Sequence, residues 1–318
     1  MNSSQELHVV FGAGQIGPLL ARRLVEGGKS VRIARRSSAP VDVTGAQLAR
    51  GDAFDSAFCE QAARGAAVVY HCMNTSYFAK VWEETLPRLQ ANLIAAAGKA
   101  GARLVVLDNL YSIGRTHGRP MNEDTPPRPC SRKGEIRARL AESLWAADKA
   151  GLVRVAVGRA ADFYGPQGRL SQFGDFFWPR VLQGKSGPVL MRLDTPHTYS
   201  FTHDVAAGLC ALGADAAALG RTWMLPASPA QPTERLVELL GQELGHPIRV
   251  QRMPGPLLAL ASVFWAMGRE LKEMGYQWDE PFVLDDARFR AQFPSVAPTS
   301  LEEGARQTVE WAKKAYAQ

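Results

Sequence analysis

Three glycines near the N-terminus, Gly12, Gly14 and Gly17, lie between an apolar run and a segment of helical period. In this setting the first glycine permits a tight turn, the second lets the backbone approach a ligand, and the third allows close packing of helix on strand. The free N–H groups at the start of such a helix bind phosphate. The segment HVVFGAGQIGPLLARRL therefore predicts a strand–turn–helix unit that binds a dinucleotide, with Gln15 and Ile16 in the binding turn.

Beyond these glycines, at the place that distinguishes NAD from NADP, the sequence reads IARRS and contains no carboxylate. An acidic side chain there would bond the ribose hydroxyls of NAD, whereas guanidinium groups bind a phosphate through paired donors that are always charged. Arg35, Arg36 and Ser37 are therefore expected to hold the 2′-phosphate of NADP(H), which is favoured over NAD(H). The alternative is that Arg35 and Arg36 are solvated loop charges, as arginines commonly are.

The first half of the chain alternates short Val- and Ile-rich runs with segments of helical period, which is the pattern of βα units in a parallel sheet. The expected strands are 7–11, 30–34, 47–50, 68–72, 103–107 and 154–158. The expected crossover helices are 18–26, 56–64, 86–100 and 136–150. The sequence thus predicts the α/β class, with a Rossmann-type doubly wound parallel sheet.

The second half of the chain loses this alternation after Gly165 and passes through an aromatic, glycine-rich stretch. Residues 5–163 are expected to form the NADP-binding Rossmann domain, to which 198–226 return. Residues 164–197 and 227–318 are expected to form a smaller C-terminal substrate-binding region. Tyr164, His197 and Tyr199 are expected to contact an apolar or aromatic substrate, and the alternative for such aromatic side chains is core packing.

Polar groups follow two further expected strands, at the carboxyl edge where ligands bind in open α/β sheets. Asp52 follows the third strand and is expected to accept the adenine amino group. The backbone of Cys72, Met73 and Asn74 closes the fourth strand and is expected to lie along the adenosine and ribose. The alternative for both places is a strand-end turn with local side-chain capping.

Charge, cysteines and hydropathy restrict the class of partner. The net charge of +6 is spread along the chain without long basic runs, so a phosphate-rich small ligand explains it without nucleic acid. The four cysteines lie far apart, with no histidine at ligand spacing, which predicts neither a metal site nor disulfides. The N-terminus lacks a signal-peptide pattern, and the apolar segment 256–267 is too short to span a bilayer. We expect a cytoplasmic protein with a small-molecule substrate and no membrane partner.

The sequence also resembles a known family, the extended short-chain dehydrogenase/reductases, including the NAD(P)-dependent epimerase/dehydratase group. The resemblance rests on GAGQIG at 12–17, GDAFD at 51–55, VVYHCMN at 68–74, LVVLDNLYSIG at 104–114, GRAADFYGP at 158–166, YSFTHDVAAGL at 199–209 and PTSLEEGARQTVEWAK at 298–313. It implies a Rossmann domain with a smaller C-terminal domain over the nicotinamide end, and a homodimer. It also implies a hydride-transfer site with a Tyr-x-x-x-Lys pair and an upstream Ser or Thr.

This sequence departs from that catalytic pair. There is no tyrosine between Gly114 and the helix expected at 136. If Arg137 takes the usual Lys position, Lys133 stands in place of the Tyr, and the Ser/Thr position falls on Asn109. The run KGEIR at 133–137 also resembles the Lys-x-x-Ile-Arg element of the isoflavone-reductase-like atypical members, in which a lysine transfers the proton.

These residues predict an NADP(H)-dependent oxidoreductase of a small apolar or aromatic carbonyl-type substrate. Lys133, which also contacts the coenzyme, is the expected proton donor, with Asn109 orienting the carbonyl and Tyr111 as the second candidate acid. The alternatives are a solvated charge for Lys133 and a packed ring for Tyr111. At the level of function the alternatives are a nucleotide-sugar epimerase or dehydratase, which the missing tyrosine weakens, and a non-catalytic NADP(H) sensor.

Overall fold

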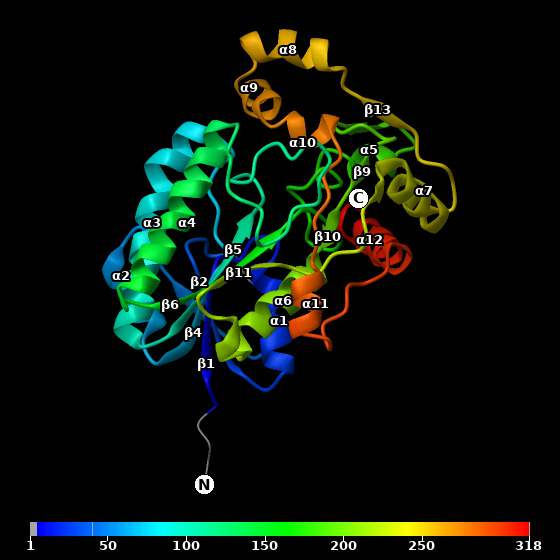
Figure 1. Ribbon diagram of the computed structural model, residues 1–318. Coiled ribbons are helices and arrows are strands. Elements are labelled where there is room, and N and C mark those ends of the chain that lie inside the picture. The colour runs from blue at the N-terminus through cyan, green and yellow to red at the C-terminus, as the bar shows by residue number, and fades with distance from the viewer. Residues whose placement is uncertain (1–4, 40, 318) are drawn as a thin grey trace.

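A seven-stranded parallel sheet forms the centre of the computed structural model, which describes residues 5–39 and 41–317 (Figure 1). The strand order is β11-β6-β5-β4-β1-β2-β3. The strands are β1 (Leu7–Phe11), β2 (Ser30–Arg35), β3 (Ala46–Arg50), β4 (Ala66–His71), β5 (Arg103–Asn109), β6 (Arg154–Ala160) and β11 (Arg221–Met224). The order reverses between β1 and β4, and ligands bind in the crevice beyond such a reversal. The predicted Rossmann-type α/β class is confirmed.

Helices cover both faces of the sheet because alternate strand residues point to opposite sides. On β1, Val9 faces the core beneath α2 (Ser56–Ala63), α3 (Ala79–Ala100) and α4 (Arg132–Lys149). Its neighbour Val10 faces the core beneath α1 (Gly17–Glu26), α6 (Thr202–Ala214) and α11 (Ala287–Gln292). A short 3₁₀ turn, η1 (Ala216–Ala218), follows α6.

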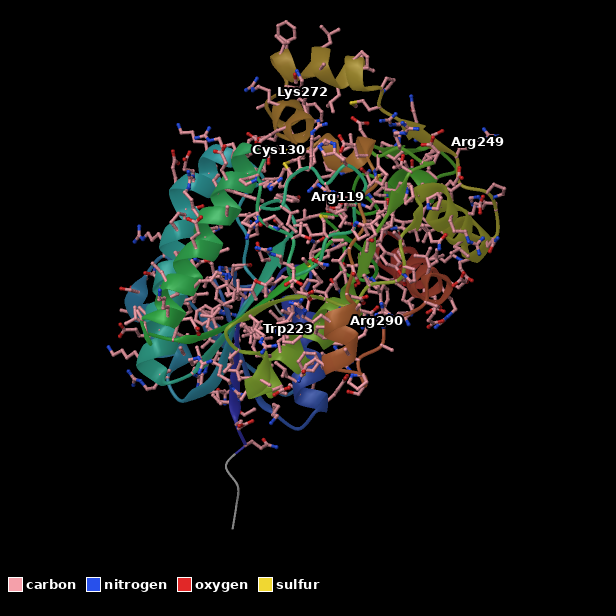
Figure 2. All side chains as sticks on the ribbon, viewed as in Figure 1. Arg119, Cys130, Trp223, Arg249, Lys272 and Arg290 are labelled. Atoms are coloured by element: carbon pink, nitrogen blue, oxygen red, sulfur yellow. The ribbon has the colours of Figure 1, made fainter. Side chains whose placement is uncertain are left out.

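The six expected strands are found within two residues of their predicted bounds. Two helices begin earlier than predicted. Helix α3 begins at Ala79 instead of residue 86, and α4 begins at Arg132 because Ser131 caps it, accepting a hydrogen bond from the Gly134 N–H at 3.0 Å. The seventh strand, β11, was not predicted. Its Trp223 packs edge-on against Phe289 of α11 (Figure 2), so a buried aromatic contact helps hold this strand beside β6.

The C-terminal part of the chain builds a second core beyond the carboxyl edge of the sheet. It contains three two-stranded pairs: β7 (Asp162–Tyr164) with β10 (Tyr199–Phe201), β9 (Pro196–His197) with β12 (Gln231–Pro232), and β8 (Gly187–Val189) with β13 (Val250–Arg252). Its helices are α5 (Trp178–Val181), α7 (Thr233–Leu244), α10 (Tyr276–Asp279) and α12 (Leu301–Ala315). Aromatic side chains of 164–201 fill the space between these pairs and α7 and α12.

Two further helices, α8 (Gly255–Phe264) and α9 (Ala266–Glu273), leave this second core and are called the arm here. Figure 1 shows α8 at the outer end of the molecule and α9 between α8 and the rest of the chain. Within 5–39 and 41–317, no helix combines the length and apolarity needed to cross a membrane.

Candidate functional site

The glycine turn between β1 and α1 has room for a ligand at one glycine only. Gly12 has a φ of +109°, and a Cβ on it would lie 2.8 Å from the Cys72 carbonyl oxygen. A Cβ on Gly17 would overlap the Gly12 carbonyl, whereas one on Gly14 would meet nothing within 4 Å. Helix α1 starts after Ile16 with no acidic residue in its first turn. The turn is therefore closed by packing at Gly12 and Gly17 and open at Gly14, as a pyrophosphate requires.

The loop after β2 carries the predicted phosphate-binding cations. Arg35 donates to the Ala39 carbonyl at 3.1 Å, and the Ser37 hydroxyl accepts from the Ala39 N–H at 3.1 Å. The Arg36 side chain is 78% exposed, with its guanidinium 3.9 Å from the Asp52 carboxylate. Asp52 also accepts from the Phe54 N–H at 3.0 Å. Arg36 is thus the cation with the greatest freedom to reach a ligand, and Asp52 forms the local capping turn considered as its alternative.

The predicted adenosine-binding backbone lies against the glycine turn. The Cys72 N–H donates to the Phe11 carbonyl at 2.9 Å, and Met73 donates to Nδ1 of His71 at 3.2 Å. Burial raises the pKa of the Cys72 thiol to about 12, so the thiol stays protonated. The Asn74 carboxamide oxygen accepts from Arg137 at 3.2 Å, which ties this loop to α4.

Lys133 is buried and its ammonium is bonded entirely within the chain. It lies in the first turn of α4, and Nζ donates to the Glu270 carboxylate, to the Glu270 carbonyl at 3.3 Å and to Glu273 at 3.3 Å. The ammonium also lies 4.7 Å from the ring centre of Tyr77. Three acceptors match the three protons of an ammonium group. Lys133 is therefore neither the solvated charge of the alternative interpretation nor a donor with a free proton in this arrangement.

Two phenols meet near the end of β5. The Tyr111 and Tyr77 hydroxyls are 3.1 Å apart, and Asn109 holds the turn by accepting from the Tyr111 N–H at 3.1 Å. Both rings pack on Trp82, with centroids 6.1 Å and 5.5 Å from it. Burial raises the pKa of Tyr111 and of Tyr77, and the Asp162 carboxylate raises both further. Both phenols are therefore neutral and can donate a hydrogen bond at neutral pH.

Arg137, at the position of the family lysine, is held by side chains of α3 and β5. Its guanidinium lies 4.6 Å from the Trp82 ring centre and 3.5 Å from the Asp108 carboxylate. Its Nε is buried without a hydrogen-bond partner among the residues described. Arg159 bonds the other Asp108 oxygen at 3.3 Å. A cavity of about 10 Å³ beside Arg137 and His71 has the space of one water molecule.

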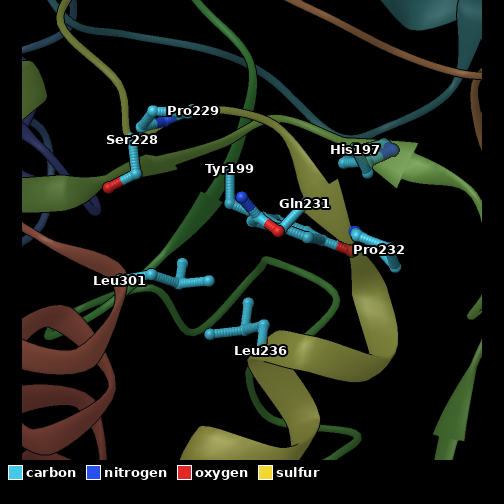
Figure 3. Close-up of a pocket in the computed structure, with 8 residues that line it drawn as sticks. All are labelled: His197, Tyr199, Ser228, Pro229, Gln231, Pro232, Leu236 and Leu301. Carbon is cyan, nitrogen blue, oxygen red and sulfur yellow. The ribbon is translucent and has the colours of Figure 1, made fainter.

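The residues expected to contact substrate are packed. Figure 3 shows His197 and Tyr199 beside Gln231, Pro232 and Leu236 in the lining of one pocket. This pocket has no space for a water molecule. The Tyr199 hydroxyl is 2.9 Å from that of Thr233, and Nε2 of His197 lies 3.1 Å from Asp162. Tyr164 is fully buried in the same core. Core packing, the stated alternative, describes the positions of these three residues in this structure, and their contact with substrate stays a prediction.

The sequence reasoning missed the partners of Lys133 and Tyr111. Glu270 and Glu273 are 137 and 140 residues from Lys133 along the chain, and Tyr77 is 34 residues from Tyr111. The one available signal was the i, i+3 spacing of the two glutamates, which places them on one face of a helix. That spacing is common on exposed helices and points to no particular partner.

Comparisons with known proteins agree with the Rossmann-type fold. The NAD dependent epimerase/dehydratase family matches residues 8–223 of the chain. DesIV, a dTDP-glucose 4,6-dehydratase from Streptomyces venezuelae, is similar in structure with a TM-score of 0.79 at 19% identity, over 97% of this chain and 97% of that chain. UDP-glucuronic acid 4-epimerase from Bacillus cereus is similar with a TM-score of 0.78 at 15% identity, over 98% and 99%. No curated protein matches the sequence. At such identities the structural likeness establishes the fold.

Proposed function

The chain belongs to the NAD dependent epimerase/dehydratase family, and from that premise we propose that it binds NADP(H) and catalyses hydride transfer at a hydroxyl-bearing carbon of a nucleotide sugar or related substrate. The observation that carries this proposal is the glycine turn, which admits no side chain at Gly12 and Gly17 and faces open space at Gly14. The family match favours this function over the small-carbonyl reductase predicted first from the sequence.

The proposed coenzyme site would use residues at the ends of β1 and β2. The backbone N–H groups at the start of α1 bind the pyrophosphate, and Arg36 with Arg35 binds the 2′-phosphate. A bound nicotinamide supplies the chemistry of accepting or returning a hydride. The remaining catalytic task for the chain is to orient the substrate oxygen and to transfer its proton.

Tyr111 is the proton-transfer residue of this proposal, in place of the absent tyrosine of the Tyr-x-x-x-Lys pair. Among the residues that the structure describes, its hydroxyl has one partner, the Tyr77 hydroxyl at 3.1 Å, through which a proton can pass. Asn109 holds the turn that carries Tyr111, and its amide N–H₂ is a further donor for a substrate oxygen. Lys133 acts as a positioning residue, because its charge lies over the Tyr77 ring.

The first experiment is calorimetric titration with NADP⁺, NADPH, NAD⁺ and NADH. We expect NADP forms to bind more tightly than NAD forms, and Arg35→Ala with Arg36→Ala to remove that preference, since a phosphate would lose its cations. Arg64→Ala with Arg221→Ala, which removes two exposed arginines elsewhere, is the matched control. Equal affinity for NAD and NADP forms would refute the preference for NADP and leave a dinucleotide site without that preference. Absence of binding for all four would refute the proposal.

The second arm of this test is turnover of UDP- and dTDP-sugars, followed by NMR of the sugar. We expect Tyr111→Phe to lower kcat by about 10²–10⁴-fold, the usual contribution of a general acid or base, with coenzyme affinity unchanged. Tyr77→Phe, which keeps the ring beneath Lys133, should have a smaller effect. Full activity of Tyr111→Phe would exclude Tyr111 from proton transfer.

A second candidate function is NADPH-dependent reduction of a carbonyl. The observation that favours it is the pair of neutral phenols, Tyr111 and Tyr77, whose hydroxyls are 3.1 Å apart and can donate a hydrogen bond to a carbonyl oxygen. Oxidation of NADPH by a panel of aldehydes and ketones, with no change in any sugar nucleotide, would support this candidate over the first. Tight NADPH binding without turnover of either panel would support the sensor.

A further inference from the structure

The outward surface of α8 is apolar and exposed to solvent. Its inner side is marked by Leu258 and Ser262, which are 7% and 6% exposed. The outer side chains, called the apolar face here, are Leu257 (54% exposed), Leu260 (64%), Val263 (61%), Phe264 (89%) and Trp265 (44%). Single exposed apolar residues are ordinary, but a contiguous group of this kind marks an interaction surface.

The charges around the apolar face are positive. Figure 2 shows Lys272 on α9, beneath α8, and Arg249 beside β13, to the side of the arm, and both side chains are exposed. Arg269 donates to the carbonyls of Ser262 and Val263 at 3.4 Å and so caps the end of α8. The two glutamates of α9 are mostly buried and bond Lys133, whose ammonium neutralises one of their two charges.

The length and composition of α8 select the kind of partner. Ten residues of helix span about 15 Å, half of the roughly 30 Å hydrocarbon layer, so α8 can lie along a bilayer but cannot cross it. Residues 253–268 carry no charge, and Trp265 stands at the end of the apolar face, where tryptophan favours a membrane–water interface. Flanking cations attract anionic headgroups.

We propose that the arm docks on the surface of an anionic lipid bilayer, with the apolar face among the upper acyl chains and Arg249 and Lys272 against the headgroups. The sequence predicts no membrane partner because its apolar segment is too short to span a bilayer. A helix that lies in the membrane–water interface does not need the length of a spanning helix. The apolar face is separate from the glycine turn, so this proposal does not rest on coenzyme binding.

The test is co-sedimentation of the full-length protein with vesicles of phosphatidylcholine alone or mixed in equal amounts with phosphatidylglycerol. We expect binding to the mixed vesicles that weakens as salt is raised, and at least about tenfold weaker binding to phosphatidylcholine alone. Leu260→Ser with Phe264→Ser should weaken binding to the mixed vesicles at least about tenfold. Arg249→Glu with Lys272→Glu should abolish the preference for the anionic lipid.

A matched control keeps the test specific to the arm. Leu170 and Phe176 are 83% and 82% exposed and lie outside the arm, so Leu170→Ser with Phe176→Ser should bind vesicles as the wild type does. Dinucleotide titration of every variant reports that the sheet is folded. Absence of wild-type binding, or unchanged binding of the Leu260→Ser with Phe264→Ser variant, would overturn the proposal. A wild-type dimer that this variant dissociates would also overturn it, because a second copy would then cover the apolar face.

Discussion

Gly14 and Gly17 stand three residues apart in the same turn but constrain it differently. A Cβ on Gly17 would overlap the Gly12 carbonyl, so Gly17→Ala should lower the free energy of unfolding by about 1–3 kcal/mol, as overpacking does. A Cβ on Gly14 would meet no protein atom within 4 Å, so Gly14→Ala should leave stability within about 0.5 kcal/mol of wild type.

The affinity for dinucleotide should reveal the effect of Gly14→Ala that stability does not. Gly14→Ala places a methyl group in the space assigned to the pyrophosphate, and we expect at least about tenfold weaker affinity in a folded protein. Urea denaturation and calorimetric titration of both variants check the pair of expectations. A Gly14→Ala protein with wild-type affinity would show that the pyrophosphate does not approach this residue.

At the scale of elements, α9 is joined to α4 through Lys133 and to α3 through Glu270. Glu270 bonds both the Lys133 ammonium and the Ala79 N–H at the start of α3, the latter at 3.0 Å. Glu270→Gln with Glu273→Gln would leave a buried ammonium without a counter-charge. Because the two carboxylates are 16% and 23% exposed, we expect a loss of about 2–3 kcal/mol, below the usual cost of breaking a fully buried pair.

The matched variant adds Lys133→Met to these two substitutions. Removing the ammonium also removes the uncompensated charge, so the triple variant should be more stable than the double glutamine variant. Urea denaturation of the wild type, the double variant, Lys133→Met and the triple variant completes the cycle. Strictly additive losses of stability would mean that the three groups do not interact in solution.

The elements differ in how far the sequence determines them. Strands β1, β4, β5 and β6 follow directly from runs such as HVVF and RLVVL, because a strand buried on both faces needs consecutive apolar residues. Helix α3 extends past its predicted start because Trp82 and Leu86 are buried in the sheet core, a tertiary contact that helical period alone underweights. Strand β11 is only four residues long and lacks a βα pattern of its own.

The parts of the candidate site that lie within one short segment of the chain could be predicted from the sequence. The glycine turn, Arg36 and the 72–74 backbone are each local, and their spacing along the chain defines their places at the sheet edge. Lys133 was identified by its position in KGEIR, but its environment comes from Glu270 and Glu273 of a distant helix. Tyr199 has an aromatic sequence neighbourhood typical of either a pocket or a core, and only packing against Thr233 distinguishes the two.

At the scale of the whole molecule, buried histidines determine how stability responds to acid. Burial lowers the pKa of His8 to about 4, and burial together with the Arg137 charge lowers that of His71 to about 4. These groups are neutral in the folded chain and titrate near 6.5 when unfolded, so between pH 6.5 and 4 the unfolded state binds more protons. The free energy of unfolding therefore falls as pH is lowered through that window.

Each such histidine contributes a slope of up to about 1.4 kcal/mol per pH unit within the window. Asp204 opposes them, since burial raises its pKa and its folded form takes up a proton first.

Urea denaturation at pH 7 and pH 5 should show a drop in the free energy of unfolding between the two pH values. We expect this drop to be smaller by about 2–4 kcal/mol in His8→Gln with His71→Gln. His246→Gln, at an exposed site, should leave the drop unchanged. Carboxylates with lowered pKa values, such as Glu303, lose their contribution to stability only below this pH range. A drop of wild-type size in the double variant would therefore show that neither His8 nor His71 causes the acid sensitivity.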